Sequence, residues 1–266
     1  MSRFEARMTR RTFARGSVAA SVALAAGFPA GRAAMAQDEL PPLPEGATVV
    51  ADGLLNPRFL AMGDDGSLYI TECGVGGDEV LLPPNAQGTP APEVSPEEAP
   101  ANAVMRGYTG QITKVAPDGT QSVLVPGLAS YSTGIGPAGI ATSGSDLYFA
   151  MGGTGVAGGV DPLPEENTVN HVNPETGEVT MIAELGPYEE ENNPDGQNIN
   201  PNLHELEVDF DGRLIACDQG GNTIYAVDPS SGEIEVLVVI PTLGQLPGGQ
   251  EITGDAAQRQ SMPTSL

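Results

Sequence analysis

The stretch NPRFLAMGDDGSLYITE, residues 56–72, decides the fold of this 266-residue chain. Two short runs of alternating apolar residues flank the turn formed by Asp65, Gly66 and Ser67. Asp and Gly favour tight hairpin turns, because Gly accepts positive φ and Asp binds its own backbone. The stretch therefore predicts a β-hairpin, which either stands alone or is one copy of a repeat.

The hairpin has two counterparts further along the chain. LYI at 68–70 is matched by LYF at 147–149 and by LIA at 214–216, and each follows a turn sequence. A second hairpin follows each first one, so the unit has four strands. Repeats of four antiparallel strands, spaced by roughly 65–80 residues, are typical of propeller blades. The quoted stretch is then the inner hairpin of the first blade.

The first strand of each unit shows matching positions. Pro57, Pro137 and Leu203 stand where the three strands are expected to begin. Alternation then places Leu60 at an inward position, with Ile140 and Leu206 as its counterparts. Residues 47–54, ATVVADGL, are expected to form one more apolar strand ahead of the first unit.

The repeat predicts an all-β fold, a β-propeller of four-stranded antiparallel blades. About three blades and the start of a fourth are expected, because the final PTSL matches PRFL of the first strand. Three blades do not close a ring, so we expect a C-terminally truncated chain, with two associating half-rings as the alternative. The expected bounds are signal peptide 1–36, linker 37–46 and partial propeller 47–266, with blade 1 at about 57–128, blade 2 at about 137–185, blade 3 at about 203–240 and the start of blade 4 at 262–266.

The first 36 residues have a different composition. Paired Arg10 and Arg11 precede Thr-Phe, an Ala/Val-rich run follows, and AMA at 34–36 supplies a small-x-small cleavage pattern. The segment resembles a twin-arginine export signal, with a Sec signal or an uncleaved anchor as alternatives. The apolar run is short for a span of ~20 residues. We therefore expect the twin-arginine (Tat) export machinery as a partner, no membrane span after cleavage, and a periplasmic or extracellular location.

The charge and the cysteines narrow the possible partners and cross-links. The chain has 35 acidic residues against 11 Lys and Arg, a net charge of −24. It repels nucleic acid and anionic membrane surfaces, so no nucleic-acid partner is expected. Cys73 and Cys217 are the two cysteines, and the repeat places them in non-adjacent blades. We expect two buried or unpaired thiols.

A set of motifs occurs in a fixed order along the chain. They are the twin-arginine leader, VVADGLLNPRFLAMGDDGSLYITE, TGQITKVAPDGTQSVLVPGL, GPAGIA, GRLIACDQGGNTIYAVDP and the final PTSL. The ordered set resembles the ScyD/ScyE family of exported bacterial propellers, which are TolB-like or NHL-like, over roughly 47–266. The resemblance implies a six-bladed ring, of which about half is present, and implies no established chemistry.

The mouth of the central channel is one candidate site, because inner strands begin and second strands end there. The expected ligand or channel residues are Asn56, Arg58, Glu72, His204, Glu205 and Asp218. Glu72 and Asp218 hold matching repeat positions and are the candidate metal ligands, with Ca²⁺ as the expected ion. Alternatively, both carboxylates accept backbone hydrogen bonds at blade edges. No catalytic residue is assigned, because no nucleophile, zinc-ligand or phosphate-loop motif occurs.

Three long connections, at 74–110, 152–166 and 186–202, are expected on the face that carries the channel mouth. Their acidic residues are Asp78, Glu79, Glu93, Glu97, Glu98, Asp161, Glu165, Glu166, Glu189, Glu190, Glu191 and Asp195. Carboxylate and amide oxygens are Ca²⁺ ligands. An acidic chain also has acidic loops by default, so a metal site and a solvating surface both remain open.

Two functions fit these patterns. We expect a non-catalytic scaffold that binds a small molecule or a protein partner on the loop face. The alternative is a divalent-metal-dependent hydrolase or lactonase, like the gluconolactonase-type propellers, with Glu72, Asp218 and Asn56 around the cation. A fold shared by many activities does not decide between them.

Overall fold

The protein is described from a computed structural model. The described residues are 43–82, 94–100, 103–154, 162–197 and 199–240, with the backbone of two short strands at 245–246 and 250–251. The chain divides into one unit at Met1–Thr48 and another at Val49–Leu266. The first unit contributes a described turn in which the Ala47 amide donates to the Pro44 carbonyl at 3.0 Å. The expected leader, most of the linker and the expected start of blade 4 lie outside the described residues.

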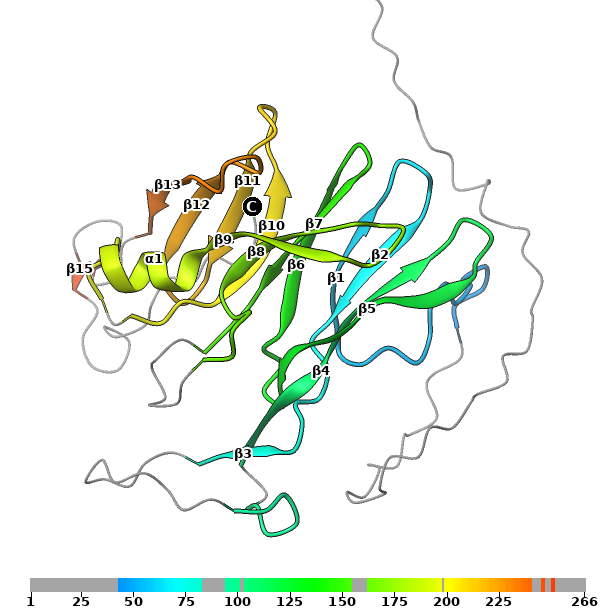
Figure 1. The fold of residues 1–266 in the computed structure, drawn as a ribbon, viewed down its shortest axis with the longest axis horizontal. Coiled ribbons are helices and arrows are strands. Elements are labelled where there is room, and N and C mark those ends of the chain that lie inside the picture. Colours follow the sequence, from blue (N-terminus) through cyan, green and yellow to red (C-terminus); the bar gives the residue numbers. More distant parts are fainter. Residues whose placement is uncertain are drawn as a thin grey trace, which may run out of the picture. The chain divides into compact units, whose positions relative to one another are not determined.

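Three large antiparallel sheets make up the described part of the second unit (Figure 1). The first has the order β1-β2-β4-β5, with the short strand β3 beside the far end of β4. The other two have the orders β6-β7-β8-β9 and β10-β11-β12-β13. Each sheet thus contains a four-stranded up-and-down unit, to which the first sheet adds β3, and this confirms the predicted all-β fold of four-stranded antiparallel blades.

The strand bounds of the first sheet are β1 Pro57–Met62, β2 Leu68–Glu72, β3 Glu79–Leu81, β4 Val104–Val115 and β5 Gln121–Tyr131. Those of the second sheet are β6 Pro137–Ser143, β7 Asp146–Met151, β8 Thr168–Val172 and β9 Val179–Glu184. Those of the third sheet are β10 Leu203–Val208, β11 Leu214–Asp218, β12 Thr223–Val227 and β13 Ile234–Val239. The helix α1 spans Leu185–Asn192, and β14 Gln245–Leu246 pairs with β15 Gln250–Glu251.

The stretch at 56–72 forms the hairpin of β1 and β2. Its turn is fixed by Asp65, whose carboxylate accepts from the Ser67 amide and hydroxyl, each at 2.8 Å, while Gly66 takes a φ of 83°. These hydrogen bonds from Ser67 hold the pKa of Asp65 below its usual value. Asp118 and Asp228 close equivalent second-hairpin turns in the same way. The Asp and Gly residues that predicted turns therefore form them.

The apolar cores lie between sheets. One cluster joins the first and second sheets and includes Tyr69, Ile112 and Phe149, and another joins the second and third sheets and includes Ala150 and Leu206. The inner strands β1, β6 and β10 contact one another in that order. At Gly139 a side chain would overlap the backbone of β10, so glycine permits this close approach. Burial between neighbouring sheets is the way in which propeller blades are stabilised.

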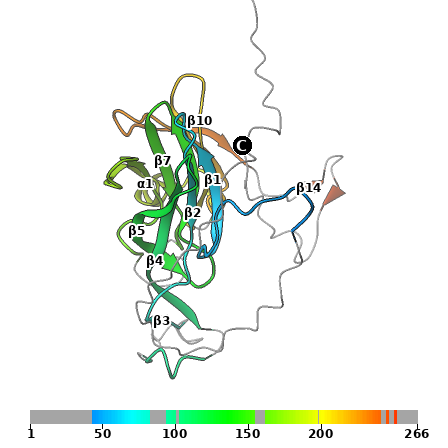
Figure 2. The same ribbon diagram turned by 90° about the vertical axis from the view of Figure 1, so that its right-hand side faces the viewer.

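Two expectations for the beginning of the propeller are corrected. Leu60 is 65% exposed, whereas its counterparts Ile140 and Leu206 are 5% and 1% exposed. The counterparts face a neighbouring sheet, while the outer side of the first sheet, seen in Figure 2, has no described sheet against it. Residues 47–54 form no strand, since no described strand pairs with them.

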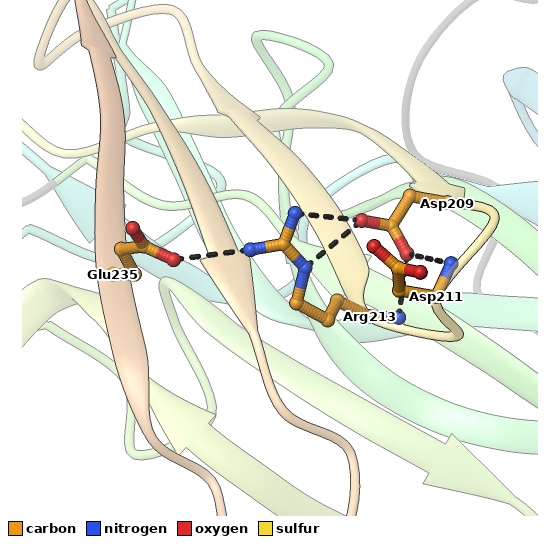
Figure 3. Close-up of polar contacts among 4 residues, drawn as sticks. All are labelled: Asp209, Asp211, Arg213 and Glu235. Atoms are coloured by element: carbon orange, nitrogen blue, oxygen red, sulfur yellow. Dashed lines mark hydrogen bonds and ion pairs between the residues drawn. The ribbon is translucent and has the colours of Figure 1, made fainter.

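Arg213 ties an inner turn to the outer strand of the third sheet (Figure 3). Its Nε and Nη2 contact Asp209 Oδ2, each at 2.9 Å, and its Nη1 donates to Glu235 Oε2 at 3.0 Å. Asp209 Oδ1 accepts from the amides of Asp211 and Arg213. The turn between β10 and β11 is thus stabilised by Asp209 within the turn and by the contact of Arg213 with Glu235 of β13.

Three further features complete the fold. The helix α1 was not predicted; it follows β9, contacts β8 and stacks Tyr188 edge-on against Tyr225 of β12 at 5.7 Å. Cys73 and Cys217 are buried and free, which confirms that expectation. Among the described residues, no helix combines the length and apolar character that crossing a bilayer requires.

Candidate functional site

A cavity of about 120 Å³ lies where the inner strands begin and the second strands end. The residues around it are Arg58, Cys73, Thr133, Gly134, Ile135, Gly136, Ala138, Gly152, Asn202, Leu203, His204 and Gln219. They come from all three sheets and from the connections between them. No Asp or Glu is part of this described lining, although the chain is strongly acidic.

Arg58 and His204 meet at this cavity from β1 and β10. Arg58 Nη2 lies 3.2 Å from His204 Nε2, and the imidazole stacks edge-on against Phe59 at 5.1 Å. A guanidinium can only donate, so His204 Nε2 is the acceptor in this contact. Arg58 retains further N–H groups and is exposed to solvent. The pair therefore presents a cation whose orientation is fixed on one side.

Asn56 belongs to the same corner of the cavity. Its φ of 59° turns the chain into β1, and its carbonyl accepts from the Cys73 amide at 3.0 Å. A side chain at Gly134 would lie 3.3 Å from Asn56 Nδ2 and 3.7 Å from Arg58 Nη1. The structure thus brings the predicted residues Asn56, Arg58 and His204 together.

Cys73 lines the cavity without being a nucleophile. Its Sγ donates to the Pro137 carbonyl at 3.3 Å, and burial raises the pKa of the thiol to about 11. The thiolate, which is the reactive form of cysteine, is scarcely populated at neutral pH.

Glu72 lies outside the cavity lining and is fully buried. One carboxylate oxygen accepts from the Leu55 amide. The other accepts from Gln111 Nε2 at 2.9 Å and from Thr113 Oγ1 at 2.5 Å. Both oxygens are occupied by donors of the first sheet and its approach segment, so this carboxylate joins strands.

Asp218, the repeat counterpart of Glu72, is also fully buried and also lies outside the lining. Its Oδ1 accepts from the amides of Asn202, Gly220 and Gly221 at 2.8, 3.0 and 2.8 Å. Its Oδ2 has no hydrogen-bond partner. The structure does not bring Asp218 to Glu72, because each is held within its own sheet.

Glu189 of α1 faces Asp218. Its Oε1 accepts from the Asn200 amide at 3.0 Å, and its Oε2 has no partner. Burial and the adjacent Asp218 raise the pKa of Glu189 to about 8, and burial raises the pKa of Asp218. Tyr225 is buried beside them, and burial followed by these two acids raises the pKa of its hydroxyl. This carboxyl pair was not predicted as a unit.

Glu205 lies on β10 opposite Cys217 and takes no part in the lining. Burial, followed by the charges of Glu205 and Asp218, raises the pKa of the Cys217 thiol to about 12. The charge of Glu205 therefore affects the buried Cys217 thiol of the third sheet and not the cavity. Among the described residues, no three or more His, Cys, Asp or Glu side chains are grouped so that they could hold a metal ion.

A second hollow, of about 430 Å³, lies on the opposite face between the first and second sheets. It is bordered by Lys114, whose Nζ donates to the Pro174 carbonyl at 3.1 Å and lies 5.3 Å from the Tyr69 ring centroid. Sequence reasoning overlooked this hollow, although the short Asp-Gly turns that surround it were predicted.

Several lining residues also escaped prediction. Thr133, Asn202 and Gln219 lie in connections, within two residues of a strand end. In the sequence they differ from other polar loop residues only by lying next to a predicted strand end. That position alone does not identify a residue that lines a cavity. Gly136 and Gly152 also line the cavity, and a side-chain carbon at either would lie 2.8 Å from the Cys73 carbonyl oxygen or 3.0 Å from the Leu203 carbonyl oxygen, respectively, so glycine permits this close packing.

Distant likenesses to known proteins are found at the level of structure. No protein-family model matches the sequence, and no curated protein matches it. Solved structures do match. A luciferin-regenerating enzyme shares 15% identity at a TM-score of 0.42, over 70% of this chain and 47% of its own. A gluconolactonase from Xanthomonas campestris shares 18% sequence identity at a TM-score of 0.40, and the match covers 70% of this chain and 48% of that protein.

A calcium-binding protein, regucalcin from Agrobacterium tumefaciens, shares 16% identity at a TM-score of 0.34, over 68% of this chain and 59% of its own. The chain spans about half the length of the first two of these structures. Likenesses at these TM-scores carry no argument about the fold or the activity of this chain.

Proposed function

We propose that this chain is part of an exported, non-catalytic β-propeller of the ScyD/ScyE type that binds a small anionic ligand at the cavity around Arg58. Export through the twin-arginine route, to the periplasm or beyond, is part of the proposal and rests on the leader sequence. The function proposed is that of a binding protein, with a carboxylate- or phosphate-bearing small molecule as its ligand.

One observation carries this proposal. The cavity at the strand ends has a guanidinium and no carboxylate in its described lining, within a chain of net charge −24. Arg is suited to carboxylate and phosphate groups, because its fork of N–H donors matches two oxygens at once. His204 Nε2 contacts Arg58 Nη2 and so holds one side of the guanidinium, which leaves its other N–H groups for a ligand. Asn202 and Gln219 add amide groups to the same lining.

The hydrolase alternative has less support from the described residues. A metal-dependent hydrolase needs carboxylates directed into the cavity, with an open position on the metal. Neither Glu72 nor Asp218 lines the cavity, and the Cys73 thiol is protonated at neutral pH. A nucleophile paired with a base is not found among the described lining residues.

The test is calorimetric titration of the leaderless protein with acetate, citrate and inorganic phosphate. We expect saturable binding of at least one probe, and Arg58→Met should weaken it about tenfold or more, which corresponds to ~1.4 kcal/mol. Arg213→Met is the matched control, because it removes the same charge from the opposite face and should leave the affinity unchanged. Binding by Arg58→Met equal to that of the unaltered protein would contradict the proposal.

A parallel assay separates the hydrolase alternative from binding alone. Glucono-δ-lactone is incubated with the protein in the presence and absence of Ca²⁺, and acid release is followed. We expect no turnover above the uncatalysed rate. Metal-dependent turnover that Glu72→Gln abolishes would replace the binding proposal with the hydrolase.

A further inference from the structure

Buried oxygen atoms without donors gather where α1 and the loop after it meet the turn between β11 and β12. They are Glu189 Oε2, Asp218 Oδ2 and Asn222 Oδ1, and all three residues are fully buried. A buried polar atom without a partner costs free energy, so native structures normally supply one. Apart from a proton shared between the Glu189 and Asp218 carboxyls, the described residues supply no hydrogen-bond donor to these oxygens.

The two carboxylates are held face to face. Three backbone amides fix Asp218 through Oδ1, and the Asn200 amide fixes Glu189 through Oε1. The remaining oxygens converge over Gly221: a side-chain carbon there would lie 2.5 Å from Glu189 Oε2 and 2.9 Å from Asp218 Oδ2. The absence of a side chain at Gly221 leaves this space to the two oxygens.

The adjacent amide is oriented with its oxygen free. Asn222 Nδ2 donates to Asp195 Oδ2 at 2.6 Å, which leaves Oδ1 as the unoccupied end of the side chain. Asp195 thus acts as a positioning residue for Asn222. Asn222 directly follows Gly221, so its unoccupied carbonyl oxygen belongs to the same turn over which the two carboxylates converge. Carboxylate and amide oxygens are the ligands that Ca²⁺ prefers.

Two facing carboxylates in a buried position need a positive charge between them, either a proton or a metal cation. The basic side chain of the third sheet cannot provide it, because Arg213 lies in the turn at the other end of β11 and is paired with Asp209 and Glu235.

We propose that Glu189 and Asp218 bind a Ca²⁺ ion, with Asn222 Oδ1 as a third side-chain oxygen. The ion joins α1 to the turn after β11. The same turn supports the cavity wall, because Asn202 donates its amide to Asp218 and accepts from the Gln219 amide at 3.1 Å. This site is separate from the anion cavity, and it pairs Asp218 with a residue of α1 instead of with Glu72.

The experiment uses the leaderless protein stripped of metal with a chelator. Calorimetric titration with CaCl₂ alone should show one saturable site, and the melting temperature should rise with Ca²⁺ as mass action requires. Mg²⁺ should bind more weakly, since it demands a tighter octahedral geometry. Glu189→Gln and Asp218→Asn should each raise the Kd for Ca²⁺ about tenfold or more.

Glu190→Gln is the matched control. Glu190 is the next residue of α1, carries the same charge and is exposed, so its loss should leave the Kd unchanged. In the stripped protein, Glu189→Gln should still fold, because its amide can donate to Asp218 Oδ2. Either of two results would overturn the proposal: no single-site Ca²⁺ binding, or Glu189→Gln binding Ca²⁺ as well as the unaltered protein. Anion binding at Arg58 is measured separately, so neither result bears on it.

Discussion

Glu72 and Asp218 occupy the same position in two different sheets, and their surroundings differ. Each is the last residue of a second strand and stands opposite the first residue of its inner strand, Pro57 or Leu203. Glu72 receives donors on both oxygens, whereas Asp218 receives three donors on Oδ1 and none on Oδ2. The same repeat position therefore carries a carboxylate with both oxygens hydrogen-bonded in the first sheet, and a carboxylate with one unbonded oxygen in the third sheet.

The difference comes from the third strand and from the connection that precedes it. In the first sheet, Gln111 and Thr113 of β4 face back toward the carboxylate and donate to it. Their counterparts in the third sheet are Thr223 and Tyr225 of β12. Thr223 donates instead to the Gly221 carbonyl, and the Tyr225 hydroxyl has no hydrogen-bond partner.

The largest expected effect follows from exchanging each carboxylate for its amide in the presence of chelator. Glu72→Gln should lower the free energy of unfolding by about 2 kcal/mol. Both oxygens of Glu72 accept hydrogen bonds, so the NH₂ group of the new glutamine would have to face one of these donors. Asp218→Asn should change it by less than about 0.5 kcal/mol, because Oδ1 keeps its three amides and Nδ2 can donate to Glu189. Urea unfolding curves of the two variants provide the measurement. Equal losses in both variants would remove the distinction between the two positions.

A smaller effect is expected at the counterparts on the third strands. Thr113→Val removes a donor to a buried carboxylate and should cost about 1 kcal/mol of unfolding free energy. Tyr225→Phe removes a hydroxyl that has no partner and should cost less than about 0.5 kcal/mol. The same unfolding experiment compares them. A larger loss for Tyr225→Phe would mean that its hydroxyl supports the carboxyl pair.

The smallest expected effect concerns the cysteines beside the two carboxylates. Cys73 and Cys217 are buried, and their raised pKa values keep both as thiols near neutral pH. At pH 8 the native protein should therefore react slowly with Ellman's reagent, and both thiols should react in denaturant. Cys73 should react first, because it borders the cavity. Rapid labelling of Cys217 in the native protein would show that the third sheet opens readily.

The repeated sheets were predictable because their signals are local. Asp65-Gly66 type turns and alternating apolar runs specify hairpins within a few residues, and β1, β6 and β10 begin at Pro57, Pro137 and Leu203 as expected. The outward exposure of Leu60 was not predictable from alternation, because the pattern does not show whether a neighbouring sheet covers that face.

The site was predictable only in part. Asn56, Arg58 and His204 were expected at the strand ends and meet there. Glu189 was one of many loop acids, and its burial depends on α1, an eight-residue helix that contains Gly and Pro and has little intrinsic helical preference. Such a helix is stabilised by its tertiary contacts. Which acid becomes buried is therefore decided by packing between distant segments.

The few basic residues of the propeller have a consequence for proteolysis. The described ones are Arg58, Arg106, Lys114 and Arg213. Each makes a hydrogen bond or ion pair that joins separate strands or connections, and the first three lie inside strands. Trypsin cuts only after Lys or Arg and needs a locally unfolded segment, so it can cleave after the three strand residues only once their sheet has opened. The rate of tryptic digestion therefore reports how often the sheets separate.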